Sequence, residues 1–351
     1  MVAEFHRALV ETPSVSHDET AVADVAEAFF RDHGVWVERW ENNVVARAGS
    51  GPKLLFNTHL DTVPPTPSWT DDPWKIRRDG DKVIGLGSND AKASAACMAL
   101  ALLEVAKSGG PCEVTLTLVQ EEETGGRGTE VVWPRLQQSG YRPEGIVVGE
   151  PTGLAVGTSQ KGMLVLELVS RGQACHAANA AELGAVNPVW GLAADLVALQ
   201  GVSLGPEHPQ LGKTTLQPTS LSAAEARNQV SDVAQCVLDI RSVPGVLHEE
   251  IVELLRAHVS GEIRARSIRL QPYQCPEDAV VVRAALSAGG RGTFGSRTMS
   301  DQVFFAGWPA IKCGPGDTAR SHTADEYVLE SELEEGLMFY NQLVKEFAAH
   351  A

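Results

Sequence analysis

Acidic and imidazole side chains recur at the ends of five short segments of this chain. They are His59 and Asp61, then Asp90, the run Glu121 to Glu123, Glu150, and His322. Imidazole nitrogens and carboxylate oxygens are the ligands that zinc and related divalent cations take in hydrolytic enzymes. A pair of metal ions held by such groups can activate a water molecule for hydrolysis. The set therefore indicates a two-metal hydrolase site.

Each of these residues also has a structural explanation when it is taken alone. Asp90 could cap a helix that follows it, and Glu121 to Glu123 could be a solvated charge run before a turn. Glu150 could close a turn at the following proline, and His322 could be a hydrogen-bonded polar histidine. We favour the metal site because all five segments occur together.

The elements that must position these side chains follow from the hydrophobic pattern. Strands are expected at Trp36–Trp40, Val44–Ala46, Lys53–Thr58, Val114–Val119 and Ile146–Val148, and helices at Thr20–Phe30 and Ala91–Val105. Several of these strands lack polar alternation, as strands covered on both faces do. The pattern predicts an α/β domain with a mixed, largely parallel sheet. Open sheets of this kind bind ligands beyond the carboxyl ends of their strands, where the candidate residues fall.

Composition limits the other possibilities. The chain has 351 residues, of which 43% are hydrophobic, so we expect two domains. Its formal charge of −16 disfavours nucleic acid and anionic membranes as partners. No apolar run reaches the roughly 18 to 20 residues of a membrane span, and no signal peptide is recognisable, so the cytoplasm is expected. The six cysteines contain no Cys-x-x-Cys pair, which is typical of reduced thiols.

Five motifs contain the candidate residues. They are Asn57 to Pro64, Gly85 to Lys92, Glu121 to Gly125, Val148 to Thr152, and Gly314 to Gly316 followed by Ser321 to Tyr327. In order and spacing they resemble the M20 family of co-catalytic metallopeptidases and deacylases, over about Glu11 to Val328. The resemblance implies a zinc-hydrolase-type catalytic domain with an inserted, smaller α+β lid or dimerisation domain.

The resemblance also implies a set of metal ligands. Asp90 would bridge two divalent ions, His59 and Glu150 would complete one site, and Glu123 and His322 would complete the other. We expect two Zn²⁺ ions, although Co²⁺ or Mn²⁺ could substitute in this nitrogen and oxygen set. The family commonly has a cis peptide bond directly after its bridging aspartate, and we expect one here.

Two further residues receive catalytic roles by resemblance. Glu122 would be the general base, because the family places its base immediately before the glutamate ligand. It would take a proton from the attacking water and return it to the departing amine. Asp61 would orient His59 from behind the metal site.

Residues 161 to 271 differ in character and are expected to form the inserted domain. Residues 1 to 160 and 272 to 351 would then form the catalytic domain. Strands at Met163–Ser170 and Cys236–Arg241, with helices at Ala185–Leu199 and Leu247–Val259, predict a small α+β layer. The resemblance implies that the chain forms a homodimer through this lid.

Three residues of the insertion resemble functional positions of the family. His176 lies in the motif Gly172 to Ala177, whose histidine stabilises the oxyanion in the active site of the neighbouring subunit. Asn228 and Arg241 resemble positions that hold the substrate, and Arg241 would clamp a carboxylate. The alternative for Arg241 is a surface ion pair at a strand end.

The resemblance implies removal of an acyl group, first of all acetyl, from an N-acylated amino acid. Leu55 to Pro64 and Gly314 to Asp317 resemble the acetylornithine and acetylcitrulline deacetylases of arginine biosynthesis. Val303 stands where succinyl-diaminopimelate desuccinylases tend to have an arginine, which disfavours that substrate. The alternatives are a dipeptidase, a lysine-biosynthesis deacylase acting on a carrier-linked or N-acetyllysine substrate, and a succinyl-diaminopimelate desuccinylase. A non-catalytic metal-binding scaffold is least favoured, because no ligand position and no base is missing.

Overall fold

The computed structural model describes residues 1–224 and 226–351, which divide into two compact units. The first unit contains Met1–Thr158, Cys275–Phe294 and Ser300–Ala351, and the second contains Ser159–Gln274 and Gly295–Met299. The insertion expected at residues 161 to 271 falls within the second unit. Among the described residues, no helix is both long and apolar enough to cross a membrane.

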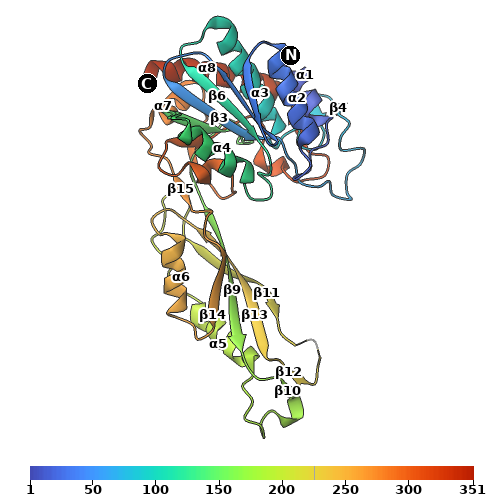
Figure 1. Ribbon diagram of the computed structural model, residues 1–351, viewed down its shortest axis with the longest axis vertical. Helices are drawn as coiled ribbons and strands as arrows, with labels where there is room; N and C mark the ends of the chain where they lie inside the picture. Colours follow the sequence, from blue (N-terminus) through green and yellow to red (C-terminus); the bar gives the residue numbers. More distant parts are fainter. Residues whose placement is uncertain (225) are drawn as a thin grey trace. The chain divides into compact units, whose positions relative to one another are not determined.

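A mixed sheet forms the framework of the first unit (Figure 1), with the strand order β1-β2-β6-β3-β7-β17-β8. The strands are β1 (Trp36–Trp40), β2 (Asn43–Ala48), β3 (Lys53–His59), β6 (Glu113–Val119), β7 (Gly145–Val148), β8 (Val156–Gln160) and β17 (Ala310–Lys312). The short strands β15 (Tyr273–Gln274) and β16 (Thr293–Ser296) pair with β8. Parallel pairing joins β6 to β3, β3 to β7 and β7 to β17, whereas β1 with β2, β2 with β6, and β8 with β17 pair antiparallel. The α/β fold class is confirmed, but the parallel part is a four-stranded core rather than most of the sheet.

The central strands are apolar because helices cover them. In β3 and β6, Leu54, Phe56, Leu116 and Leu118 are fully buried. Helix α3 (Lys92–Ser108) lies against β2, β3, β6 and α8, and its run of small alanine side chains allows this close approach. The helix ends at Gly109, whose φ of 77° is the left-handed conformation that glycine adopts readily.

Other helices and a small sheet complete the first unit. The helices are α1 (Val2–Val10), α2 (Thr20–Asp32), α4 (Arg127–Gln138), α7 (Val280–Ser287) and α8 (Glu330–His350), with short 3₁₀ helices η2 (Asp301–Phe305) and η3 (Thr318–Arg320). A three-stranded sheet has the order β18-β5-β4, formed by β4 (Arg77–Asp79), β5 (Lys82–Ile84) and β18 (Tyr327–Leu329). Among these helices, α2 corresponds to the helix expected at Thr20–Phe30.

The second unit is a four-stranded antiparallel sheet with two helices (Figure 1), in the order β11-β13-β9-β14. Its elements are β9 (Gly162–Arg171), β10 (Cys175–His176), η1 (Ala177–Asn179), α5 (Pro188–Leu199), β11 (Thr215–Ser222), β12 (Gln229–Val230), β13 (Val233–Ser242), α6 (His248–Arg256) and β14 (Glu262–Ser267). Alternate residues of β9 and β13 form a core with Leu192 of α5 and Ile251 of α6. The edge strand β11 has no alternating pattern because nearly all of it is exposed, and the sequence analysis did not predict it.

Candidate metal and catalytic site

Three central strands of the first unit, β3, β6 and β7, end at the same edge of the sheet, and the candidate side chains lie at or directly after these strand ends. His59 is the last residue of β3 and is paired with Val119, the last residue of β6. Asn57 of β3 is paired with Val148, the last residue of β7. The glutamate run and Glu150 therefore follow their strands at the same edge of the sheet as His59.

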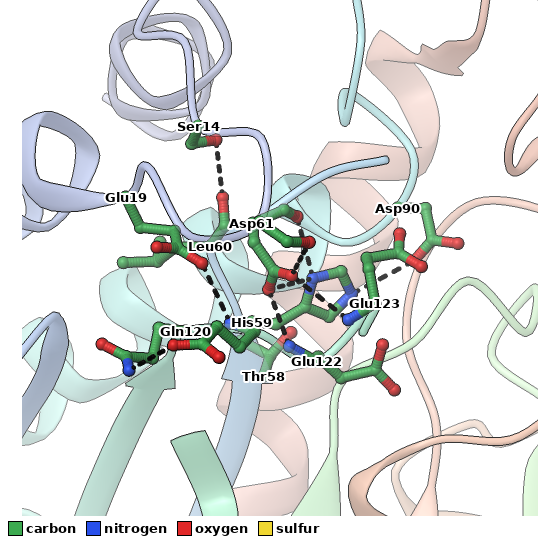
Figure 2. A network of polar contacts seen from close by, with 12 residues as sticks. Ser14, Glu19, Thr58, His59, Leu60, Asp61, Asp90, Gln120, Glu122 and Glu123 are labelled. Atoms are coloured by element: carbon green, nitrogen blue, oxygen red, sulfur yellow. Dashed lines mark hydrogen bonds and ion pairs between the residues drawn. The ribbon is translucent and has the colours of Figure 1, made fainter. Parts of the chain in front are cut away.

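A compact group of ligand atoms lies at this edge. Ligand atoms of His59, Asp90 and Glu123 all lie within 4.8 Å of one another, which is close enough to hold a metal ion. Figure 2 shows His59 with Asp61 on one side and with Asp90 and Glu123 on the other. The distance from His59 Nε2 to Asp90 Oδ1 is 3.3 Å.

His322 joins this group from the other side of Asp90. Its Nε2 atom is 3.0 Å from the Glu123 carboxylate and 3.8 Å from Asp90 Oδ2. The two oxygens of Asp90 thus face different histidines, His59 and His322. A carboxylate placed in this way can bridge two metal ions, as the resemblance implies.

Glu150 belongs to the same electrostatic environment. It is 7% exposed, and burial together with the neighbouring Asp90 raises its pKa to about 8. Its loop is tied to β3, because Thr58 Oγ1 donates to the carbonyl oxygen of Gly149 at 2.7 Å. The structure brings Glu150 to the cluster but gives it no direct contact with the other ligand atoms.

Asp90 does not cap the helix that follows it. Helix α3 begins at Lys92 with Ala91 in the N-cap position, and no side chain makes a capping hydrogen bond there. The helix-cap explanation for Asp90 is therefore wrong. The peptide bond between Asp90 and Ala91 is cis, as expected.

Asp61 contacts both His59 and the glutamate segment. His59 Nδ1 is 3.0 Å from the main-chain oxygen of Asp61 and 3.5 Å from its carboxylate. The same carboxylate accepts hydrogen bonds from the main-chain N–H groups of Glu122 (3.0 Å) and Glu123 (3.1 Å), and from the Ser16 hydroxyl (2.7 Å). The expected orientation of His59 is thus only part of what Asp61 does, because it also anchors the glutamate segment.

The three consecutive glutamates have different surroundings. Glu121 is 8% exposed and forms ion pairs with His17 (3.2 Å) and Arg127 (3.3 Å), so the run is not a solvated charge cluster. Glu123 contacts His322. Burial, and then the neighbouring Glu150, raise the pKa of Glu122 well above its usual range. Glu122 therefore stands beside the cluster as a partly buried carboxylate with high proton affinity, which suits a general base.

The positively charged groups of the protein do not compensate all the carboxylates at this site. Burial raises the pKa of Glu122, Glu123 and Glu150, and each also feels at least one other carboxylate of the site. Buried carboxylates are costly unless cations or hydrogen bonds compensate them. Divalent ions among these oxygens and the two imidazoles would supply that charge. The donor set therefore fits a pair of metal ions of the zinc class.

The remaining predicted residues lie in the second unit. His176 in β10 pairs with Gln229 of β12, which brings its ring Nε2 to 3.5 Å from Asn228 Nδ2. The ring Nδ1 accepts the N–H of Ala178 at 3.2 Å, so a neutral ring carries its hydrogen on Nε2. The His176 ring and the side-chain amide of Asn228 are therefore neighbouring polar groups.

Arg241 lies near the end of β13 and is held by a carboxylate of its own strand. Its Nε and Nη2 atoms donate to the two carboxylate oxygens of Asp239 at 2.8 and 3.1 Å. The ion pair considered as the alternative for Arg241 is thus present. A substrate carboxylate would have to share or displace it.

Several residues that hydrogen-bond to the loops and strands of the site were not identified from the sequence. Glu326 accepts hydrogen bonds from main-chain N–H groups of the Asp90 loop. Asp301 accepts from Thr129 (2.6 Å) and Asn57 (3.1 Å), which links η2 and α4 to the end of β3. Glu326 lies within a motif that the sequence analysis singled out, four residues after His322, but a motif shows neither burial nor partners.

The fold and the histidine and carboxylate cluster define a metal-dependent hydrolase. The family model for peptidase family M20/M25/M40 matches residues 55–346, and this chain belongs to that family. The expected family, fold class and metallohydrolase activity are thereby confirmed.

Known relatives share most of the length of this chain. An acetylornithine deacetylase from Erwinia tasmaniensis is 26% identical, covering 99% of this chain and 98% of that protein. An M20 family metallo-carboxypeptidase from Sulfolobus solfataricus has a similar structure, with a TM-score of 0.81 at 17% identity and 99% of both chains covered. A dinuclear metal-binding M20 peptidase from Bacillus subtilis has a TM-score of 0.70 at 14% identity, covering 98% and 96% of the two chains. Deacetylase and peptidase names thus both occur among these proteins.

Proposed function

We propose that this chain is a two-zinc amide hydrolase that removes an acetyl group from an N-acetylated amino acid such as N-acetylornithine or N-acetylcitrulline. The observation that carries the proposal is the partly buried carboxylate of Glu122, with its raised pKa, beside the cluster of His59, Asp90, Glu123 and His322. The full-length similarity to an acetylornithine deacetylase supports the choice of substrate.

In this proposal Asp90 would bridge the two ions, His59 and Glu150 would hold one, and Glu123 and His322 would hold the other. When bound, the ions would lower the pKa of a water molecule and polarise the scissile carbonyl group. Glu122 takes the proton of the attacking water and passes it to the leaving amine. Asp61 keeps Glu122 oriented through the hydrogen bond from its main-chain N–H.

Three positively charged side chains of the second unit, Lys161, Arg241 and Arg297, support a substrate that carries a negative charge. Burial, and then Arg297 and Arg241, lower the pKa of Lys161, so both arginines lie close enough to act on the lysine. The Lys161 N–H donates to the carbonyl oxygen of Ser296, the residue before Arg297, at 3.1 Å. Every N-acyl amino acid carries a carboxylate, and Arg241 is the member of this cluster that we assign to it.

Arg241→Met is expected to raise KM for the N-acetyl amino acid and to change kcat little. A hydrogen-bonded charge pair contributes about 1.5 to 3 kcal/mol, or roughly 10- to 100-fold in KM. Arg264→Met is a matched control, because Arg264 pairs through Nε and Nη2 with Glu262, also two residues earlier on its strand. Steady-state kinetics of both variants would test the assignment, and equal KM values in the two would contradict it.

We also propose that the chain forms a homodimer through the second unit. Its edge strand β11 leaves backbone groups open to pairing with another strand. Helix α5 exposes Trp190 (76%) and Val197 (70%), and a groove of about 600 Å³ lies between the end of α5 and β11. Exposed apolar side chains beside an open sheet edge are typical of a protein interface. A second copy of this chain is the partner that we propose for it.

In such a dimer His176 would serve the active site of the partner. Its Nε2–H and the Asn228 amide would donate to the oxyanion that forms as water attacks the carbonyl carbon. Mixing inactive His176→Asn chains with inactive Glu122→Gln chains is therefore expected to restore activity. In a mixed dimer, one of the two sites has both an intact His176 and an intact Glu122.

The complementation can be measured by mixing the two purified variants after mild dissociation and following amine release. Reannealed dimers from random exchange would approach about one quarter of the wild-type rate, since half of the dimers are mixed and each has one complete site. Each variant treated alone is the control. If the mixture is no more active than its components while light scattering shows a dimer, His176 does not act across the interface.

A substrate panel tests the proposed reaction itself. The zinc-loaded protein is offered N-acetylornithine, N-acetylcitrulline, N-acetyllysine, succinyl-diaminopimelate and simple dipeptides, with Glu122→Gln as the blank. Preference for acetylated ornithine or citrulline supports the proposal and would connect the enzyme with arginine biosynthesis. Preference for dipeptides would refute the deacetylase assignment and retain only the amide hydrolase.

A further inference from the structure

One buried carboxylate binds the main chain of the loop that carries Asp90. Glu326, 1% exposed, accepts the N–H groups of Asn89 and Asp90 on Oε1, each at 2.9 Å. Its other oxygen accepts the N–H of Gly87 at 3.1 Å. Three main-chain N–H groups within four residues therefore end on the two oxygens of one side chain.

A buried lysine fixes the other end of the same loop. Lys92 is fully buried, and its Nζ atom donates to the main-chain oxygens of Leu9 (3.0 Å) and Thr12 (3.4 Å), beside the C-terminus of α1. The Lys92 side chain also passes close to Gly87, where an added Cβ would lie 3.3 Å from the lysine Cδ. The main chain of Asp90 is thus placed between two anchored points.

The segment that supplies Glu326 also supplies the candidate ligand His322. His322 and Asp325 both have left-handed φ values, 60° and 54°, which residues other than glycine adopt only when their surroundings hold them. Asp325 is held by Thr70, whose hydroxyl donates to it at 2.6 Å. One short segment therefore places a ligand, His322, and at the same time holds the loop of the bridging aspartate.

We propose that Glu326 is a positioning residue for the metal centre, which holds Asp90 in its bridging orientation before any ion binds. The inference rests on the proposed two-metal function. Its physical basis is preorganisation, because a ligand that is already fixed loses less conformational freedom when the metal binds. Glu326 touches neither the substrate nor, in this proposal, the ions, and acts only through the main chain at Gly87, Asn89 and Asp90.

Replacing Glu326 by glutamine tests this role with little change of shape. The amide keeps one acceptor oxygen, and its NH₂ group would face a main-chain N–H. Zn²⁺ affinity, measured by competition with a chromophoric chelator, is expected to fall about 10- to 100-fold, the usual cost of losing a group that orients a metal ligand. Hydrogen exchange of the metal-free chain should become faster in the peptide that contains Gly87 to Asp90. Activity at saturating zinc should recover in part.

Two further variants complete the experiment. Glu330→Gln is the matched control, since Glu330 lies four residues later and forms an exposed ion pair with Arg78; its zinc affinity should equal that of the wild type. Glu326→Asp keeps both oxygens but is one methylene shorter, and should bind zinc with intermediate affinity.

Two results would overturn the proposal. The first is a zinc affinity of Glu326→Gln within about twofold of the wild type. The second is loss of the native circular dichroism spectrum in this variant, which would mean that Glu326 is needed for global folding. A wild-type chain that takes up no zinc would instead refute the two-metal function. If the wild type binds two ions and the Glu326 variants bind equally well, only the positioning role fails.

Discussion

Glu122→Gln is expected to lower kcat by about 10²- to 10⁴-fold, the range that general acid–base catalysis contributes. Glutamine has nearly the same shape but cannot take a proton from water. The main-chain N–H of residue 122 would still donate to Asp61, so the segment should stay in place. Zinc stoichiometry and the melting temperature should therefore change little, which separates loss of the base from loss of the site.

The neighbouring residue offers a matched control for this substitution. Glu121→Gln removes a carboxylate one position earlier, where the side chain pairs with His17 and Arg127 rather than facing the ligand cluster. We expect it to keep kcat within a few-fold of the wild type. Stopped or continuous assays of amine release on both variants give the comparison. Equal losses in the two would show that the glutamate segment matters only as structure, and a fully active Glu122→Gln would remove Glu122 as the base.

Removing the metal ions is expected to abolish activity and to make stability fall as pH rises. In the metal-free protein, burial and Asp90 raise the pKa of Glu150 from 4.5 to about 8, and burial and Asp90 raise that of Glu326 to about 7. At pH values above 4.5, the pKa of these groups in the unfolded chain, and below their raised pKa in the folded chain, the folded chain binds more protons than the unfolded chain. The free energy of unfolding therefore decreases with pH across this window. His322, whose pKa the Glu123 carboxylate raises to about 9, acts in the same direction above pH 6.5.

Two buried basic groups oppose this trend over part of the range. Burial lowers the pKa of His6 to about 4, so its contribution to stability grows as pH rises through 4 to 6.5. Burial lowers the pKa of Lys92 from 10.5 to about 7, so its contribution grows above pH 7. The raised carboxylates and His322 outnumber these two groups, and we expect a net loss of melting temperature between pH 5 and pH 8. Thermal denaturation after dialysis against chelator measures this directly.

Zinc should reverse the effect, because its charge compensates the ionised carboxylates. An ion that binds only the folded chain adds about 4 kcal/mol of stability at a thousandfold excess over its Kd. The zinc-loaded protein should thus gain melting temperature relative to the metal-free protein, most strongly near pH 8, and regain activity. A metal-free melting temperature that rises from pH 5 to pH 8, or activity that survives chelation, would contradict the metal site.

The site could be predicted largely because its residues follow recognisable strands. The run Lys53 to Thr58 is apolar since β3 is covered on both faces, and the residues after such a strand must emerge at the edge of the sheet. The expected strand at Trp36–Trp40 has the same bounds in the structure, and those at Lys53 and Val114 differ by one residue. Strand β11 could not be predicted, because it is exposed and has no alternating hydrophobic pattern. The hydrogen bonds from the Asp90 loop to Glu326 could not be predicted either.

The sequence by itself determined which ligand types are present, their order along the chain, and the family to which they belong. Strand ends and motif spacing are local properties, and a short stretch of residues displays them. Only the tertiary structure decided that Glu121 turns to His17 while Glu123 turns to His322. It also decided that Glu326 holds the Asp90 loop across 236 residues of sequence. Side-chain direction and burial depend on segments that meet only when the chain has folded, so they cannot be read from neighbours in sequence.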